Sequence, residues 1–395
     1  MNSDMNVIQI VPAISNESSG PSYSVPGLCN GLTKAGCEVS LHILDDIPSQ
    51  LKQASYKVHN YPRREIGIRN LGRSPEMFDG LMDDARTADI IHNNSLWMMP
   101  NVYPAWVVKR LRRRDLNPRL KLVMAPRGTL AAWSLEKGKW KKKVFGALLQ
   151  YPALRMTDMF HATSEKECEE IRALGYRQPV AIVPIGMDLP DVDVFNAEAQ
   201  RRRESEERRR RVVFFGRLHK VKGVDRLLLA WEKVAKDGWE LVIAGPDNGM
   251  LGELKGIVVT RKLPRVSFEG EINGHAKYEF LANADIYVLP SDTENFGVTV
   301  AEALVSGTPV IASQGTPWQG LEREKCGRWV PIGVEPLAAA LEMLMAMSDE
   351  ERAAMGARGR EWIRRDFSWK GIGAKMKAAY EWLLGQGEKP MWVMV

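Results

Sequence analysis

Two carboxylates eight positions apart stand out in the stretch PSDTENFGVTVAEALVSG, which runs from Pro290 to Gly307. Glu294 lies in the polar first part, whereas Glu302 is surrounded by small and apolar residues. A carboxylate in apolar surroundings is costly unless it has hydrogen-bond partners. Hydroxyl groups of a bound sugar or ribose would supply them, and the alternative is a partly exposed helix glutamate. We favour the first interpretation because of the motifs that accompany it.

Two cations follow an apolar, β-rich run earlier in the chain, in the sequence FFGRLHKVKGV. Arg217 and Lys222 are five positions apart, and the glycines at 216 and 223 allow the backbone to approach a ligand closely. A guanidinium fork and an ammonium point charge could hold a diphosphate and neutralise the charge that develops on a leaving nucleotide, without a metal ion. The alternative is that both are surface cations that flank a strand.

These side chains need structural elements that direct them at one ligand. The sequence predicts a strand that ends at Pro290, a loop over 291–295, and a helix that begins near Phe296 or Gly297. Gly307 would cap this helix, and the proline two positions later would prevent its continuation. The free N–H groups and the dipole at such a helix start favour an anion beyond the carboxyl edge of the sheet. We therefore expect a phosphate to bind there.

The chain of 395 residues is too long for one ordinary core, and it alternates β-rich runs with helical stretches in both halves. This pattern predicts an α/β protein with two doubly wound, Rossmann-like domains of parallel strands. A charged stretch with little apolar periodicity separates the halves and indicates a linker. We expect an N-terminal domain over 1–190, a linker over 191–211, a C-terminal domain over 212–370, and a C-terminal helix and tail over 371–395 that packs back on the N-terminal domain.

Composition excludes several classes of protein. The chain is 45% hydrophobic and 26% charged, and it has no apolar run of about 18 residues that could span a bilayer. Its N-terminus is typical of a first strand and lacks the basic leader of a signal peptide, so we expect a cytoplasmic protein. The four cysteines form no C-x-x-C pair and the six histidines are scattered, so we expect neither a disulfide framework nor a zinc cluster.

The net charge of +6 and the pI near 9.0 favour a polyanionic partner, which could be nucleic acid, anionic lipid or a phosphorylated substrate. Nucleic acid is disfavoured, because the arginine runs are interleaved with glutamate and no familiar reader motif is present. Residues 137–149 join five lysines to an apolar run and could rest on an anionic membrane, or could form a solvated face. Asp191-x-Asp193 superficially matches a metal-binding pair but lies in the expected linker, so we expect no metal and no other cofactor.

The order of motifs in the second half resembles that of a known family. Arg217-x4-Lys222-Gly223, LVIAGPDNG, VSFEGEI, ADIYVLPSDTENFGVTVAEA and GTPVIAS resemble the C-terminal domain of retaining, nucleotide-sugar-dependent glycosyltransferases of the GT-B fold, the large family 4. The spacing Glu294-x7-Glu302 is the hallmark of that family. The resemblance implies two domains that face each other across a cleft, a nucleotide diphosphate sugar as co-substrate, and no metal.

In this family the second glutamate meets the nucleotide ribose, the first glutamate and the following backbone amides meet the donor sugar, and the Arg/Lys pair grips the diphosphate. The resemblance therefore implies catalytic roles for Arg217, Lys222 and Glu294. The donor site that it implies comprises Gly20, Gly216, Pro246, Glu294, Asn295, Phe296, Gly297, Val298 and Glu302.

The first half resembles the family less specifically, through SSGPSYSVPGLCNGLTKAGCEVSL and HATSEKECEEIRALG. Many members have a double glycine where this chain has Ser19-Gly20, and many have a histidine where it has Arg127-Gly128. The segment MAPRGTLAAWSLEKGKWKKK looks like a subset associated with bacterial surface polysaccharide assembly. The candidates for binding acceptor or sugar are His92, Arg127 and Trp318. The alternatives are a hydrogen-bonded core histidine, an arginine that holds its own loop, and a core tryptophan.

We expect a retaining glycosyltransferase that moves a sugar from a nucleotide diphosphate sugar to a saccharide acceptor in bacterial polysaccharide or glycan assembly. The acceptor could be carried on a lipid diphosphate, with the enzyme peripheral on the inner face of the membrane. One alternative is a GT-B-fold epimerase, which would bind the same nucleotide sugars but release a free nucleotide sugar. A less favoured alternative is a basic nucleic-acid-binding protein.

Overall fold

A computed structural model describes residues 5–14, 20–64, 71–131, 139–189 and 209–395. The chain forms two α/β units: Met1–Gly186 together with Ser368–Val395, here called unit 1, and Met187–Phe367, here called unit 2. Most of the expected linker lies outside the described residues. Its last two residues, Arg210 and Arg211, already belong to the first strand of unit 2, which corrects the expected end of the linker. The expected C-terminal domain ends at residue 370, which is three residues beyond the end of unit 2 at Phe367, because the chain returns to unit 1 at Ser368.

Unit 1 is built on an eight-stranded sheet in the order β14-β7-β6-β5-β4-β1-β2-β3. All neighbouring strands are parallel except β14, which is antiparallel to β7. The strands consist largely of apolar residues, as expected for parallel strands that helices cover on both faces. Their bounds are β1 Met5–Ile10, β2 Cys37–Leu44, β3 Lys57–Tyr61, β4 Ile90–Asn94, β5 Lys121–Ala125, β6 Met159–Ala162, β7 Val180–Ile182 and β14 Val393–Met394.

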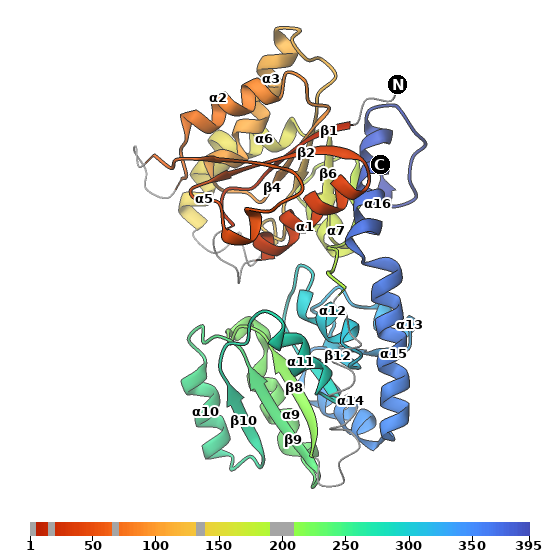
Figure 1. Cartoon of the computed structure of the whole chain (residues 1–395). Coiled ribbons are helices and arrows are strands. Elements are labelled where there is room, and N and C mark those ends of the chain that lie inside the picture. The colour runs from red at the N-terminus through yellow and green to blue at the C-terminus, as the bar shows by residue number, and fades with distance from the viewer. Residues whose placement is uncertain (1–4, 15–19, 65–70, 132–138, 190–208) are drawn as a thin grey trace. The chain divides into compact units, whose positions relative to one another are not determined.

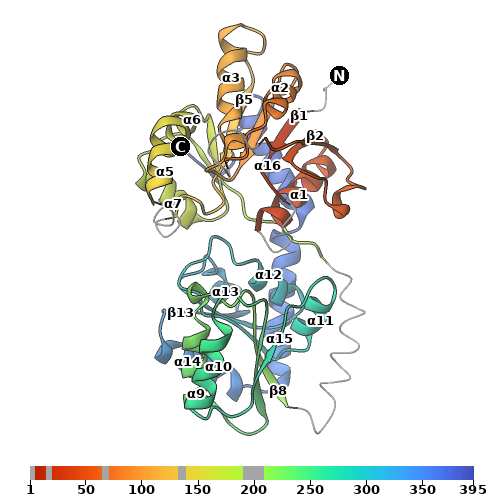
Figure 2. The same ribbon diagram turned by 90° about the vertical axis from the view of Figure 1, so that its left-hand side faces the viewer.

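The described helices of unit 1 include one that comes from the far end of the chain. They are α1 Gly20–Lys34, α2 Pro75–Asp84, α3 Tyr103–Arg113, α5 Lys139–Phe145, α6 Tyr151–Arg155, α7 Glu165–Ala173 and α16 Trp369–Leu383. Helix α16 (blue) lies along α1 (red) in Figures 1 and 2. The two backbones touch: a Cβ atom added to Gly373 would lie 2.1 Å from the Gly31 carbonyl oxygen. Any side chain at Gly373 would therefore push these helices apart.

Unit 2 is built on six parallel strands in the order β10-β9-β8-β11-β12-β13. They are β8 Arg210–Phe215, β9 Trp239–Ala244, β10 Val266–Glu269, β11 Ile286–Leu289, β12 Val310–Ser313 and β13 Gly327–Val330. This order is that of the dinucleotide-binding Rossmann sheet, and it reverses between β8 and β11. The loops after these two strands therefore begin side by side, where open α/β sheets bind ligands.

Helices cover both faces of the sheet of unit 2 (Figures 1 and 2). The described helices are α9 Val224–Val234, α10 Leu251–Thr260, α11 Ala276–Ala282, α12 Val298–Val305, α13 Gly320–Arg323, α14 Val334–Ala346 and α15 Asp349–Asp366. Helix α9 contacts α10 and α14, whereas α12 contacts α11 and α15. Both expected doubly wound, parallel domains are therefore present.

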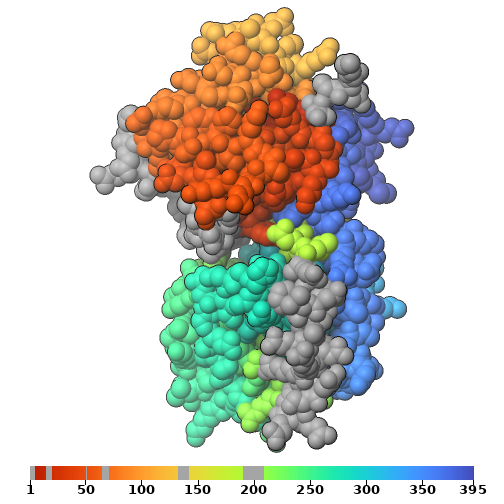
Figure 3. Space-filling model, viewed as in Figure 1, coloured from red at the N-terminus to blue at the C-terminus, as the bar shows by residue number. Residues whose placement is uncertain are grey.

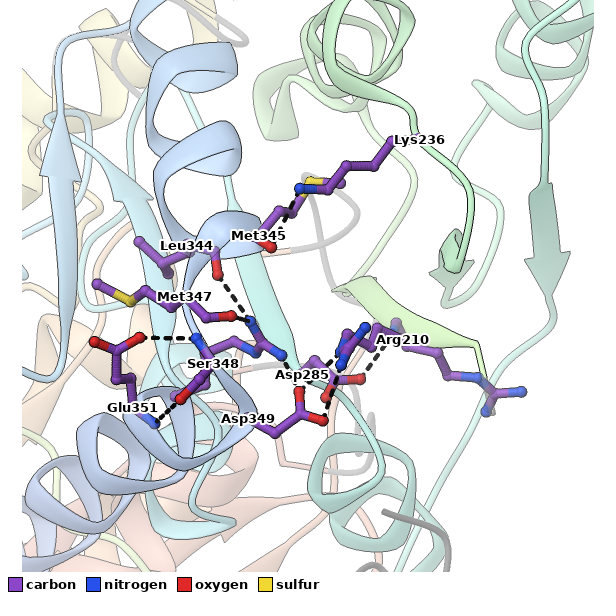
Figure 4. A network of polar contacts seen from close by, with 11 residues as sticks. Arg210, Lys236, Asp285, Leu344, Met345, Met347, Ser348, Asp349 and Glu351 are labelled. Carbon is purple, nitrogen blue, oxygen red and sulfur yellow. Dashed lines mark hydrogen bonds and ion pairs between the residues drawn. The ribbon is translucent and has the colours of Figure 1, made fainter. Parts of the chain in front are cut away.

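A polar network closes the amino edge of the sheet of unit 2 (Figure 4). Arg210, the first residue of β8, donates two hydrogen bonds of 2.8 and 3.1 Å to Asp349 at the start of α15. Arg352 is 3% exposed, bonds the same carboxylate and lies 5.0 Å from the ring of Trp239. Ser348 begins α15 with a capping box, in which its side chain and that of Glu351 bond reciprocally to the backbone. The contacts hold β8 against the α14–α15 turn, at the edge opposite the expected ligand site.

Candidate functional site

The loop after β8 carries the two predicted cations and lies against the loop after β11. Arg217 is exposed and makes no ion pair within the described part of the chain, and the next residue, Leu218, donates its backbone N–H to the Pro246 carbonyl at 2.9 Å. Gly223 ends the loop with a φ of 66°, in the left-handed region that favours glycine. A Cβ atom there would also lie 2.4 Å from the Pro290 carbonyl oxygen, so glycine is required for the two loops to meet.

An ion pair joins these loops. The Lys222 ammonium lies 2.5 Å from Glu294 Oε1, and the Ser291 hydroxyl donates to the same oxygen at 2.7 Å. The Lys222 and Glu294 side chains are only 14% and 13% exposed, so the pair is partly shielded from water. The structure therefore brings together two residues that the sequence predicted for one site, although their direct contact was not predicted.

Helix α12 begins where the sequence predicts. Gly297 forms its N-cap with a φ of 77°, and the first helical residue is Val298. The preceding turn is fastened from inside, because the Trp318 indole donates to the Phe296 carbonyl at 2.6 Å. The first turn of α12 leaves N–H groups without helical partners beside the Lys222–Glu294 pair, as an anion site requires.

Glu302 lies on the second turn of α12 and is 5% exposed. Its Oε1 atom is 2.5 Å from the Lys277 ammonium on α11, and Lys277 also lies 4.9 Å from the ring of Tyr278. Residues on every side of Glu302 along α12, from Val300 to Val305, are buried. The sequence correctly indicates that this carboxylate needs a partner. No sequence pattern identifies Lys277 as that partner, because Lys277 lies 25 positions away from Glu302.

Trp318 is not a sugar-binding ring, which corrects that candidate role. It is 2% exposed and packs among Phe296, Trp362 and Phe367 at ring-centroid distances of 5.1 to 5.6 Å. With its N–H bonded to the Phe296 carbonyl, Trp318 supports the N-terminus of α12 from inside unit 2. The Phe296 side chain is likewise buried, so only its backbone remains as a donor-site candidate.

His92 is also wrong as a residue that contacts acceptor or sugar from an open strand end. It lies within β4, is 0% exposed, and both of its ring nitrogens have protein partners. The His161 Nε2–H donates to the Val183 carbonyl at 2.8 Å, which leaves His161 Nδ1 to accept from His92 Nε2–H at 3.3 Å. The Tyr380 hydroxyl then donates to His92 Nδ1 at 2.6 Å. Burial lowers the pKa of His161 to about 3 and that of His92 well below its ordinary value, so both rings are neutral.

Arg127 joins its loop to the end of β4. It has a φ of 56°, and its guanidinium donates to Asn94 Oδ1 at 3.0 and 3.3 Å. The next N–H, of Gly128, donates to the buried Glu167 carboxylate at 2.6 Å. Burial lowers the pKa of Arg127 to about 10. Gly20 is exposed at the first position of α1, and a Cβ atom there would meet no neighbouring atom within 4 Å.

The predicted apolar face of residues 137–149 is divided in the structure, which describes no side chain from 137 to 141. Phe145 and Leu149 pack against the core of unit 1, whereas Val144 and Leu148 are 50% and 70% exposed. The Lys142 ammonium lies 5.4 Å from the Trp97 ring. Trp140, Asp191 and Asp193 lie outside the described side chains, and among the described helices none is both long and apolar enough to cross a membrane.

Two family models match this chain in succession. Residues 19–186 match the glycosyl transferase 4-like domain, and residues 196–362 match the glycosyl transferases group 1 model. The D-inositol 3-phosphate glycosyltransferase of Jonesia denitrificans is 29% identical over 237 residues, which are 56% of each chain. The phosphatidyl-myo-inositol mannosyltransferase of Mycobacterium tuberculosis is 30% identical over 216 residues, 52% of this chain and 55% of the relative. This chain thus spans about half the length of the curated relatives it matches.

Solved structures match almost the whole chain. A sucrose-phosphate synthase from Thermosynechococcus elongatus has a TM-score of 0.70 and 20% identity, and the match covers 96% of this chain and 99% of the other. The Anabaena protein HepE, solved in complex with UDP and glucose, has a TM-score of 0.71 and 17% identity, with 94% and 98% covered. At these identities the likeness shows the fold, which is GT-B, as the sequence predicts.

Proposed function

We propose that this chain, which belongs to the glycosyltransferase group 1 family, transfers a sugar from a nucleotide diphosphate sugar to a saccharide hydroxyl group with retention of configuration. The observation that carries the proposal is the meeting of Lys222 and Glu294 at the point where the strand order of unit 2 reverses. A cation, a carboxylate and the N-terminus of α12 there surround one small region. These groups suit a ligand with a diphosphate at one end and hydroxyl groups at the other.

The chemistry of each group supports a position for each part of the donor. The diphosphate lies at the N-terminus of α12 between Arg217 and Lys222, and the donor sugar lies against Glu294 and the backbone of 295–298. Glu302 accepts hydrogen bonds from the ribose hydroxyls. Its contact with Lys277 does not prevent this role, because an ionised carboxylate has about four acceptor positions and a single ammonium occupies one of them.

Transfer begins when the bond between the sugar and the diphosphate breaks. Arg217, Lys222 and the N–H groups of α12 stabilise the negative charge that develops on the departing phosphate oxygen. Lys222 has three N–H donors, so it can bond this oxygen while it keeps Glu294 in place. The acceptor hydroxyl attacks on the face that the diphosphate leaves and passes its proton to the phosphate oxygen. No metal ion takes part in this route.

The acceptor is proposed from the relatives and from the surface of unit 1. The name of one relative includes a phosphatidyl group, and WaaG, a structural neighbour with a TM-score of 0.63, is a glycosyltransferase involved in lipopolysaccharide biosynthesis. Both support a lipid-linked saccharide in bacterial polysaccharide assembly. The exposed Val144 and Leu148 beside Lys143 would then rest on an anionic membrane surface.

A donor screen tests the proposal. Purified protein is melted with a panel of nucleoside diphosphates and nucleotide sugars, and the stabilising sugar is then supplied with candidate acceptors. We expect one nucleotide class to raise the melting temperature of the wild type and to have less effect on Lys222→Ala. Transfer to a saccharide with α donor giving α product supports the proposal. A free, epimerised nucleotide sugar formed without acceptor would identify an isomerase instead.

A further inference from the structure

Three side chains that are far apart in the sequence lie close together at one edge of the sheet of unit 1. His42 on β2 and His59 on β3 are register partners in neighbouring strands, and Asp84 is the last residue of α2. His42 Nε2 and His59 Nε2 each lie near Asp84 Oδ2, and the three side chains offer one ligand atom each within 4.8 Å of one another. The segment that contains α2 (orange) lies at the surface of unit 1 in Figure 3.

The spacing of these atoms is close to that of a zinc site. His42 Nε2 lies 3.2 Å from Asp84 Oδ2, and His59 Nε2 lies 3.8 Å from the same oxygen. Ligands about 2.0 Å from a tetrahedral zinc ion are roughly 3.3 Å apart, so small shifts would complete the geometry. The two imidazole rings stack with centroids 4.7 Å apart and an angle of 11°, so the His59 ring has to tilt towards His42. His59 is 38% exposed and has room to do so.

The surroundings of His42 favour a metal ligand. Its side chain is 0% exposed, and Tyr61 Oη lies 3.0 Å from its Nδ1 atom. Tyr61 fits there because residue 80 of α2 is a glycine, where an added Cβ atom would lie 2.4 Å from the Tyr61 hydroxyl. Without a metal, His42 Nε2–H donates to Asp84 Oδ2 at 3.2 Å, and Ser40 Oγ lies 3.4 Å from the same nitrogen. A bound ion replaces the proton on Nε2, and Nδ1–H then donates to the Tyr61 hydroxyl, which is the usual arrangement of a metal-bound histidine. Asp84 is 39% exposed, so an ion and a fourth ligand from solvent can enter.

We propose that His42, His59 and Asp84 bind one zinc ion, which fastens α2 to β2 and β3. Two imidazoles and one carboxylate suit zinc better than magnesium, which prefers an all-oxygen site. Asp84 ends α2, and β3 is the outermost strand of the sheet, so the site lies at the β3 edge of unit 1. The ion therefore stabilises unit 1 by joining a helix to two strands.

Zinc titration of the full chain tests the site. Protein stripped with EDTA and dialysed is titrated with ZnCl2 against a chromophoric chelator, and its melting temperature is measured with and without zinc. We expect one zinc ion per chain and a zinc-dependent rise in melting temperature. His59→Ala and Asp84→Asn should each lose both, while Tyr61→Phe should weaken binding by roughly 10- to 100-fold. Excess magnesium should not displace the zinc.

Matched controls separate this site from adventitious binding. His275→Ala removes an exposed histidine of unit 2 and should bind zinc like the wild type. The metal-free melting temperatures of His59→Ala and Asp84→Asn show whether these variants fold, because both side chains are part-exposed. If folded His59→Ala binds zinc as the wild type does, or if the wild type binds none, the proposal is wrong and the three residues form only a hydrogen-bonded cluster.

Discussion

Replacing Glu302 by glutamine should damage two separate properties of unit 2. The first is stability, because Lys277 loses the charge of its partner 2.5 Å away in a region where Glu302 is almost fully buried. A hydrogen bond to a charged group contributes about 1.5–3 kcal/mol. A unit of this size loses about 2–4 °C of melting temperature per kcal/mol, so the loss should be roughly 3–12 °C. The second is donor affinity, which should fall about 10- to 100-fold for the same range of free energy when the charged acceptor of the ribose is lost.

Lys277→Met separates the two effects, because it removes the ion pair but keeps the carboxylate. We expect Lys277→Met to lower the melting temperature and to retain more nucleotide affinity than Glu302→Gln. A double-mutant cycle should give a coupling free energy of about 0.5–3 kcal/mol for stability. The assays are thermal unfolding, and calorimetric titration with the nucleoside diphosphate found in the donor screen. Wild-type affinity in folded Glu302→Gln would refute the ribose role, and an unchanged melting temperature would refute the ion pair.

Four further outcomes are expected. Lys222→Ala should lower kcat by roughly 10²–10³, the range for removing one preorganised donor to developing charge, and unchanged kcat in a folded variant would argue against its place beside the leaving group. Excess EDTA should leave turnover largely intact even where it lowers the melting temperature by removing zinc, whereas lost turnover restored by magnesium or manganese would contradict the metal-free route. Replacing the lysines at 139, 141, 142 and 143 with glutamine should abolish co-sedimentation with anionic vesicles, because each cation near the surface contributes about 1 kcal/mol to binding. Leu148→Ser should weaken co-sedimentation separately. If the wild-type protein does not bind such vesicles at low salt, the membrane proposal is wrong. The free energy of unfolding should fall as the pH drops below about 6.5, because His92 and His161 bind protons in the unfolded chain but not in the native protein, where their pKa values are lowered. Each histidine should lower it by up to about 1.4 kcal/mol per pH unit. Urea midpoints that stay constant from pH 7 to pH 5 would contradict the neutral ring network.

Local patterns were sufficient to predict the alternation of strands and helices in both units, the start of α12 and the need of Glu302 for a partner. They were sufficient because apolar runs, a capping glycine and an isolated charge are properties of short segments. The partners themselves come from other segments: Lys277 from α11, and Tyr380 from α16 for His92. A tryptophan such as Trp318 or a histidine such as His92 can lie either in a hydrophobic core or in a binding site. Only the fold shows which of these two positions the residue has. The same limit hid the cluster around His42, because its members come from two strands and a helix.

The path of the chain through unit 1 has a consequence for biosynthesis. A ribosome delivers residues in order, so the whole sheet of unit 2 emerges before α16 and β14 do. Until then the face of α1 that receives Gly373 is uncovered, and the ring of His92 lacks the hydroxyl of Tyr380. The part of the protein that is translated first is therefore completed last, and a nascent chain stalled before residue 368 would expose apolar surface on unit 1 to chaperones.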